Sequence, residues 1–166
     1  STRGSLTDHY DPRKNMIFLS ESVYNSASIA AVGVAAHEAG HAVQYAQGYA
    51  PVKLRTLILP VCSFGSRFAF LALTLGLVLY SQRLLLAGIV LFTLATVFQL
   101  LTLPVEFNAS RRAMAVLERE GMLMGGDLDG AGKVLQAAAL TYVAAAATSL
   151  AQLLRLLAIY GRRRRN

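Results

Sequence analysis

Two histidines and a glutamate lie within one five-residue stretch, His37-Glu38-Ala39-Gly40-His41. On a helix, residues four positions apart share a face, so both imidazoles can reach one metal ion. The glutamate between them lies close enough to act as a general base on a water that the metal activates. Catalytic zinc takes three protein ligands and leaves one position for water. The spacing therefore predicts one zinc ion per chain and a third ligand from elsewhere.

The surroundings of this stretch favour a metal site over a chance match on a surface helix. Val32–Ala36 before it and Ala42-Val43 after it are apolar. Ionisable side chains buried among such residues cost several kcal/mol unless a partner satisfies them. A bound metal would supply that partner.

The third ligand must come from the few remaining histidines and acidic residues. His9 is the remaining histidine, and the acidic candidates downstream are Glu106, Glu118, Glu120, Asp127 and Asp129. Two long apolar segments precede Glu106, and the second returns the chain to the end at which the first begins. Glu106 follows the second segment directly, so it is the preferred ligand. The alternative is an interfacial glutamate paired with Arg111 or Arg112.

Two long apolar segments separate the histidines from Glu106. Leu84–Val105 is 22 residues without a charge, and Thr56–Gln82 contains Arg67 alone. A membrane core takes about 20 apolar residues of helix, so both segments are predicted to span. The link Ser81-Gln82-Arg83 fits only a tight turn, which makes the pair a transmembrane helical hairpin. Apolar residues form 55% of the chain and charged residues 15%, against about 25% charged in soluble domains.

The fold class predicted from this pattern is mainly α and membrane-integrated, with a metal-binding helix and a short β-hairpin. Residues 1–55 form the catalytic part, with strands near 7–10 and 16–19 and a helix over about 29–47 that Ser26 or Ser28 caps. Residues 56–105 form the transmembrane hairpin. Residues 106–166 hold a helix to about residue 120, a glycine-rich loop over 121–132, an apolar helix from Val134 and a basic tail.

Four segments of the chain carry a family resemblance: Thr7–Arg13 (TDHYDPR), Leu19–Asn25 (LSESVYN), Ala35–Ala42 (AAHEAGHA) and Pro104–Arg112 (PVEFNASRR). They closely resemble the YugP-like neutral zinc metallopeptidases of bacterial membranes, over essentially the whole chain. The resemblance implies a zinc-dependent endopeptidase whose N-terminal membrane anchor and the start of whose catalytic region precede this segment.

A more distant similarity extends to the HtpX and CAAX-prenyl endopeptidase group, which is gluzincin-like in taking a glutamate as the third ligand. In that group the third ligand is the glutamate of an E-x-x-x-D motif. Glu106 matches this glutamate. The aspartate position is Ser110 here, so a carboxylate behind a zinc histidine is in doubt. Asn108 stands where YugP-like sequences often have aspartate. Both residues are candidates for a supporting or substrate-binding role.

The function expected from these observations is hydrolysis of peptide bonds, with Glu38 as the general base and His37, His41 and Glu106 as zinc ligands. The alternative is a zinc-binding membrane scaffold or partner protein without proteolytic activity. His9 and Tyr10 are candidate oxyanion donors, or they simply stabilise the hairpin. The strand over 16–19 is expected to accept an extended peptide at its edge.

Charge distribution predicts the partners and the location. The formal net charge is +7, but four of the 16 basic residues form the run Arg162–Arg165. Because no basic stripe interleaves with aromatics, no nucleic acid partner is expected. The expected partners are a peptide or protein substrate, including membrane proteins, and the lipid bilayer, with the oligomeric state left open.

Basic flanks favour the cytoplasmic side, so we expect a multi-pass protein of the bacterial plasma membrane whose active site faces the cytoplasm. The last helix, Val134–Ile159, is then expected to pack on the catalytic side or to lie at the interface, with the tail also cytoplasmic, because spanning would move four arginines outward.

Overall fold

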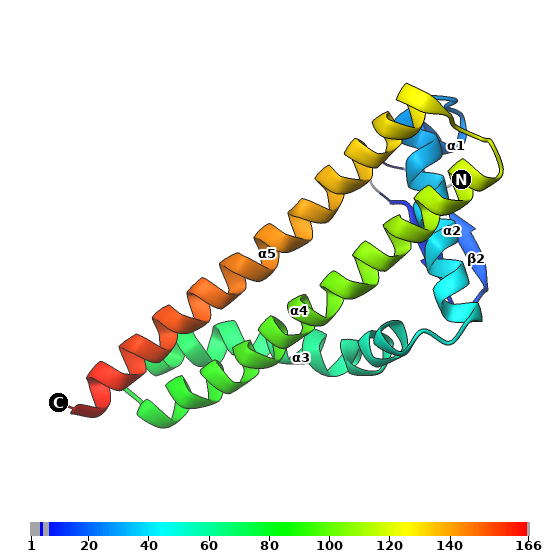
Figure 1. Ribbon diagram of the computed structural model, residues 1–166. Helices are drawn as coiled ribbons and strands as arrows, with labels where there is room; N and C mark the ends of the chain where they lie inside the picture. Colours follow the sequence, from blue (N-terminus) through cyan, green and yellow to red (C-terminus); the bar gives the residue numbers. More distant parts are fainter. Residues whose placement is uncertain (1–3, 5–6, 166) are drawn as a thin grey trace. The chain divides into compact units, whose positions relative to one another are not determined.

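The computed structural model describes residue 4 and residues 7–165 (Figure 1). Five helices and one two-stranded sheet follow in the order β1, β2, α1, α2, α3, α4, α5 in these residues, which confirms the mainly α class. The chain divides into two compact units. Unit 1 comprises Ser1–Lys53 with Pro104–Thr141, and unit 2 comprises Leu54–Leu103 with Tyr142–Asn166. Helices α4 and α5 contribute residues to both.

Unit 1 begins with the predicted β-hairpin. Strands β1 (His9–Asp11) and β2 (Met16–Phe18) pair antiparallel, with His9 opposite Phe18. In the turn between them, the carboxylate of Asp11 accepts a hydrogen bond from the backbone N–H of Arg13, and Asn15 adopts φ 48°. Asparagine tolerates this left-handed conformation better than most residues. The short helix α1 (Glu21–Tyr24) follows and was not predicted, because four residues show no helical periodicity.

Helix α2 (Ile29–Ala46) carries the two histidines. Its N-terminal cap is Ser28, whose hydroxyl accepts a hydrogen bond from the backbone N–H of Ala31, as one of the two predicted caps. The helix ends where Gly48 adopts φ 66°, a conformation that glycine takes without strain. The predicted helix over about 29–47 is confirmed.

The predicted start of a new helix at Glu106 is wrong, because helix α4 runs without interruption from Gln82 to Arg119. The hairpin helix and the Glu106 helix are one element, with Pro104 inside it. Proline removes one backbone hydrogen bond and is tolerated inside apolar helices when neighbouring groups compensate. Glu106 therefore lies in the interior of a long helix.

The predicted glycine-rich loop over 121–132 is wrong for most of its length, because helix α5 (Gly125–Arg165) already begins at Gly125. Only Gly121 to Met124 lie outside a helix, and Asp127 lies in the first turn of α5, where a carboxylate favours the positive end of the helix dipole. Gly130 lies against the side chain of Ile29 and Gly132 against that of Met114. These glycines serve close packing.

Unit 2 is a helical hairpin with a third arm. Helix α3 (Ala50–Val78) and α4 are joined by a turn in which Tyr80 adopts φ 52°. The two helices approach closely, since a Cβ on Gly76 would lie 2.5 Å from the backbone nitrogen of Leu85. The core of the unit is formed by Leu85, Ile89 and Leu156, the last from α5.

The C-terminal arm of α5 lies against the hairpin. The guanidinium of Arg163 donates to the backbone carbonyls of Gly76 and Leu77, each at 3.4 Å, and lies over the ring of Tyr80. These contacts place Arg163 at the turn end of the hairpin. The predicted packing of Val134–Ile159 on the catalytic side is therefore wrong from Tyr142 onward, because Leu156 packs on the hairpin helix α4. The alternative, a helix at the membrane interface, stays a prediction.

Three helices in the described residues are long and apolar enough to cross a membrane: α3, α4 and α5. Within their most apolar windows, only 22%, 22% and 11% of the residues are buried inside the protein. Large side chains such as Phe64 and Phe70 lie exposed on α3. Apolar surface of this extent is typical of protein that faces lipid.

Candidate metal centre

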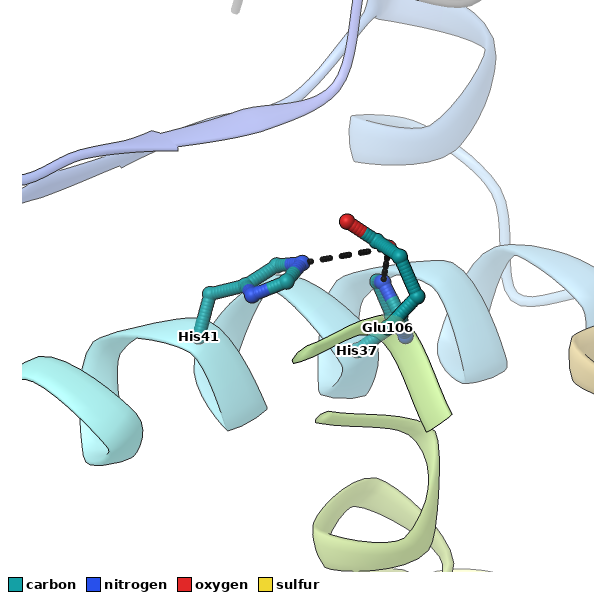
Figure 2. Close-up of side chains that lie close together, drawn as sticks. All are labelled: His37, His41 and Glu106. Carbon is teal, nitrogen blue, oxygen red and sulfur yellow. Dashed lines mark hydrogen bonds and ion pairs between the residues drawn. The ribbon is translucent and has the colours of Figure 1, made fainter. Parts of the chain in front are cut away.

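The imidazoles of His37 and His41 lie on one face of α2, and Glu106 of α4 reaches them (Figure 2). The Oε2 atom of Glu106 is 3.2 Å from Nε2 of His37 and 3.6 Å from Nε2 of His41. Only 3% of Glu106 is exposed. The structure thus brings the preferred third ligand to the two histidines.

The separations of these three donor atoms fit a zinc ion. Ligand atoms bound to tetrahedral zinc at about 2.0–2.1 Å lie about 3.3 Å from one another. The candidate ligand atoms of His37, His41 and Glu106 all lie within 4.8 Å of one another, and no other such group occurs in the described residues. Two imidazole nitrogens and a carboxylate oxygen form a donor set that catalytic zinc commonly takes.

The close approach of α2 and α4 depends on Gly40 within the histidine motif. A Cβ on Gly40 would lie 2.5 Å from the backbone oxygen of Ala109. Any larger residue would push α4 away from α2, and with it Glu106, which lies one turn before Ala109. The small residue between the two histidines therefore belongs to the geometry of the site.

The second nitrogen of each histidine has a partner that leaves Nε2 directed at Glu106. Nδ1 of His37 lies 3.1 Å from the hydroxyl of Ser110, and Nδ1 of His41 lies 3.0 Å from Oε1 of Gln44. Such partners fix the orientation of metal-binding imidazoles and raise their affinity for the metal. Ser110 was a predicted candidate for this role.

Gln44 was missed by the sequence reasoning. It is fully buried, and its amide nitrogen donates to the backbone carbonyl of Val105 at 2.8 Å and to Oδ1 of Asn108 at 3.0 Å. The available signal was its place three residues after His41, on the helix face that carries both histidines. Asn108, also a predicted candidate, contacts Gln44 and Arg112.

Glu38 lies buried beside the two histidines, with 7% of the residue exposed. Burial raises the pKa of its carboxyl, and the charge of Glu106 adds to the rise. The nearby histidines and a hydrogen bond from the backbone N–H of Tyr10 work in the opposite direction, but the pKa remains above its ordinary value. The contact with Tyr10 brings strand β1 to the general-base candidate.

The pKa of His41 is also displaced. Burial lowers it and is the largest single influence. The hydrogen bond and charge of Glu106, the hydrogen bond to Gln44 and the charge of Glu38 together outweigh burial, so the pKa of His41 lies above its ordinary value. A carboxylate that attracts a proton to this position can equally attract a metal cation.

His9 and Tyr10 make their side-chain contacts mainly within or beside the hairpin. Nδ1 of His9 lies 2.8 Å from the carbonyl of Thr7, and its ring stacks on Phe18. The hydroxyl of Tyr10 donates to Asn15, and its ring lies near Tyr45 of α2. Of the two candidate oxyanion donors, only Tyr10 has a contact with the site, through its backbone N–H.

The described residues thus combine three helices that are apolar enough to span a membrane with a His–His–Glu cluster that could hold a metal ion. The chain belongs to the family described as "Putative neutral zinc metallopeptidase", which it matches over residues 1–161. It is 51% identical over 158 residues to the "Putative membrane protease YugP" of Bacillus subtilis (strain 168), a match that covers 95% of this chain and 70% of that protein. No solved structure matches the chain.

Proposed function

We propose that this chain is the catalytic part of a membrane-embedded zinc endopeptidase. His37, His41 and Glu106 would hold one zinc ion, and Glu38 would act as the general base. The observation that carries the proposal is the convergence of both Nε2 atoms on Oε2 of Glu106, with Glu38 buried beside them. The family membership and the bacterial membrane protease relative support it.

The chemistry divides between the ion and the side chains. Bound zinc supplies a Lewis acid that polarises a carbonyl and lowers the pKa of water towards neutrality. Glu38 takes the proton from the attacking water and afterwards gives it to the leaving amine. Its raised pKa suits both steps, because a carboxylate with a pKa nearer the working pH is a stronger base and its conjugate acid still donates.

We propose that strand β1 aligns a peptide with these groups. Its residue Tyr10 directs a backbone N–H at Glu38, while β1 pairs with β2 through the register His9 to Phe18. An extended substrate held alongside the hairpin would bring its scissile bond to Glu38. The sequence pattern favoured the edge over 16–19, whereas the contact with Glu38 favours β1.

The proposed location is the bacterial plasma membrane, with the site on the cytoplasmic side. The segments around the site carry eight basic residues, and the turn end of the hairpin with the tail carries five, which favours a cytoplasmic site. The eight are Arg13, Lys14, Lys53, Arg55, Arg111, Arg112, Arg119 and Lys133, and the five are Arg83 and Arg162–Arg165. The substrates would be peptides or proteins, including membrane proteins.

The competing function is a zinc-binding scaffold without proteolytic activity. A scaffold needs His37, His41 and Glu106 but has no use for a buried carboxylate beside them. Glu38 costs free energy to bury, and its presence favours the enzyme.

The test is a comparison of the wild-type protein with Glu38→Gln, purified in detergent, by elemental analysis and by hydrolysis of a library of quenched fluorescent peptides. We expect about one zinc per chain in both proteins, but hydrolysis only in the wild type. The His37→Ala variant controls for adventitious zinc. Hydrolysis by Glu38→Gln would overturn the mechanism, and zinc without hydrolysis in the wild type would favour the scaffold.

A further inference from the structure

A chain of hydrogen bonds joins Arg112 to the metal-site histidine His41. Nε of Arg112 donates to Oδ1 of Asn108 at 2.7 Å, and Nε2 of Gln44 donates to the same oxygen at 3.0 Å. Oε1 of Gln44 lies 3.0 Å from Nδ1 of His41. We call these four residues the His41 relay.

Two groups that can act in only one way fix the direction of the hydrogen bonds in the relay. A guanidinium has only donors, so Asn108 must direct its carbonyl oxygen, and not its NH₂, at Arg112. The backbone carbonyl of Val105 can only accept, so Gln44 must direct its NH₂ at Val105 and at the oxygen of Asn108. The orientation of each amide therefore follows from groups that cannot reverse their role.

The polarity of Gln44 decides the tautomer of His41. With its NH₂ engaged by two acceptors, Gln44 offers only Oε1 to His41. Nδ1 of His41 must then carry the hydrogen, and Nε2 keeps its lone pair on the side of Glu106. Gln44 is fully buried, so water is kept from replacing these partners.

His37 has no comparable constraint. Its Nδ1 faces the hydroxyl of Ser110, and a hydroxyl can donate or accept by rotating its hydrogen. The two histidines thus differ, since the tautomer of His41 is dictated by its surroundings and that of His37 is not.

We propose that Arg112 and Asn108 are positioning residues for the metal centre, which act on His41 through Gln44. The proposal rests on the proposed function in one respect, namely that Nε2 of His41 binds zinc. Arg112 is suited to this role because it is half-buried, lies over the ring of Tyr49 at 6.0 Å, and has a second anchor in Gln47, whose Oε1 accepts from Nη1 at 2.6 Å.

The test is a double-mutant cycle on zinc affinity, measured by competition with a chelator on the full chain in detergent. Gln44→Leu removes the acceptor from His41 and is expected to weaken zinc binding about 10- to 100-fold, as losses of such partners do. Arg112→Met is expected to weaken it by a smaller factor. In the Gln44→Leu background, Arg112→Met should have no further effect, because the relay is already cut.

Two matched pairs separate positioning from a general loss of structure. Asn108→Asp keeps an acceptor towards both Arg112 and Gln44 and should retain zinc affinity, whereas Asn108→Leu should lose it about 10-fold or more. Arg119→Met, the match to Arg112→Met, removes an exposed arginine that pairs with Glu120 outside the relay and should leave zinc affinity unchanged. The absorption spectrum of the cobalt-substituted protein should change with Gln44→Leu and not with Arg119→Met.

The outcomes are distinguishable from those of the proposed function. Additive losses in the cycle, or loss of affinity in Asn108→Asp equal to that in Asn108→Leu, would overturn the relay while leaving the zinc site in place. A wild-type protein that binds no zinc would overturn both proposals. Zinc affinity that follows the cycle in a protein without hydrolysis would uphold the relay and contradict the peptidase.

Discussion

The two units hold their helices together by different means. Unit 1 joins α2 and α4 through buried polar groups, with Glu106, Gln44 and Ser110 each engaged by a specific partner. The charged residues of unit 2 are arginines without a single carboxylate, and its core is formed by leucine and isoleucine. Polar pairing fixes atoms within a narrow range of distances and directions, whereas apolar packing fixes only volumes. Unit 1, which carries the candidate metal site, relies on such pairs around its centre, whereas in unit 2 the hydrogen bonds of Arg163 lie at the turn end of the hairpin.

The largest effect is expected from removing a ligand in unit 1. His37→Ala and His41→Ala each leave two of the three proposed ligands, and both should lose zinc in elemental analysis. Glu106→Ala should also weaken zinc binding strongly, and it leaves two facing imidazoles without their shared carboxylate. Unchanged zinc content in Glu106→Ala would move the third ligand to another residue.

The effect of losing zinc should stay within unit 1. Helix content by circular dichroism should change little in His37→Ala, because the apolar contacts of unit 2 do not involve the metal. Collapse of all helical signal would contradict the independence of the two units.

The second prediction concerns the arm of α5 in unit 2. Because Arg163 contacts the end of α3, single cysteines at Leu79→Cys and Arg162→Cys should react with a membrane-impermeant maleimide from the same face of intact cells. Both substitutions are made in a Cys62→Ser background, which alone should remain unlabelled. Labelling of the two positions from opposite faces would contradict the packing of this arm.

The third prediction applies one substitution to both units. Gly40→Ala and Gly76→Ala each place a Cβ at 2.5 Å from a backbone atom of the facing segment, Ala109 or Leu85. Each should lower stability by about 1–3 kcal/mol, the usual cost of overpacking, measured by thermal unfolding in detergent. Only Gly40→Ala should also lower zinc affinity, because only this glycine sets the distance from α2 to Glu106.

Two other glycines provide matched controls for this comparison. A Cβ at Gly33 or Gly65 would meet its nearest neighbour at 3.6 or 3.7 Å, an ordinary contact. Gly33→Ala and Gly65→Ala should therefore be tolerated in both measurements. Equal loss of zinc affinity in Gly40→Ala and Gly76→Ala would show that the units are coupled.

The smallest effect is a shift in pH dependence within unit 1. Zinc needs a neutral imidazole, and Glu106 raises the pKa of His41 above its ordinary value of 6.5. As pH falls, protons should therefore begin to compete with zinc at a higher pH than for an unperturbed histidine. Glu106→Gln removes the charge that raises the pKa of His41 most, while burial still lowers it, so the dissociation constant should start to rise at a lower pH. If the dissociation constant began to rise at the same pH in both proteins, Glu106 would not be the cause of the raised pKa of His41.

The sequence predicted those features that local pattern determines. The motif His37–His41, the helix around it and the hairpin turn all follow from spacing, capping and turn residues within a few positions. Glu106 was chosen from five acidic candidates by its place after an apolar segment, and it is the one that the structure brings to the histidines.

The features that were mispredicted depend on contacts distant in sequence. The glycines of 125–132 look like a loop in isolation, yet Gly130 lies against Ile29, about a hundred residues earlier. Likewise, nothing near Gln44 in the sequence shows that Val105 and Asn108 will engage its amide. Local pattern also gave no reason to expect that the arm from Tyr142 packs on the hairpin, because that choice depends on the shape of a surface formed by α3 and α4.

The contact of Arg163 with α3 has a consequence for the order in which the chain is made. The two carbonyls at the end of α3 precede Arg163 by 87 and 86 residues, so they lack this donor while the intervening residues are synthesised. At about 5–20 residues per second, that interval lasts about 4–17 seconds. Any hairpin formed in this interval rests on the contacts between α3 and α4 alone.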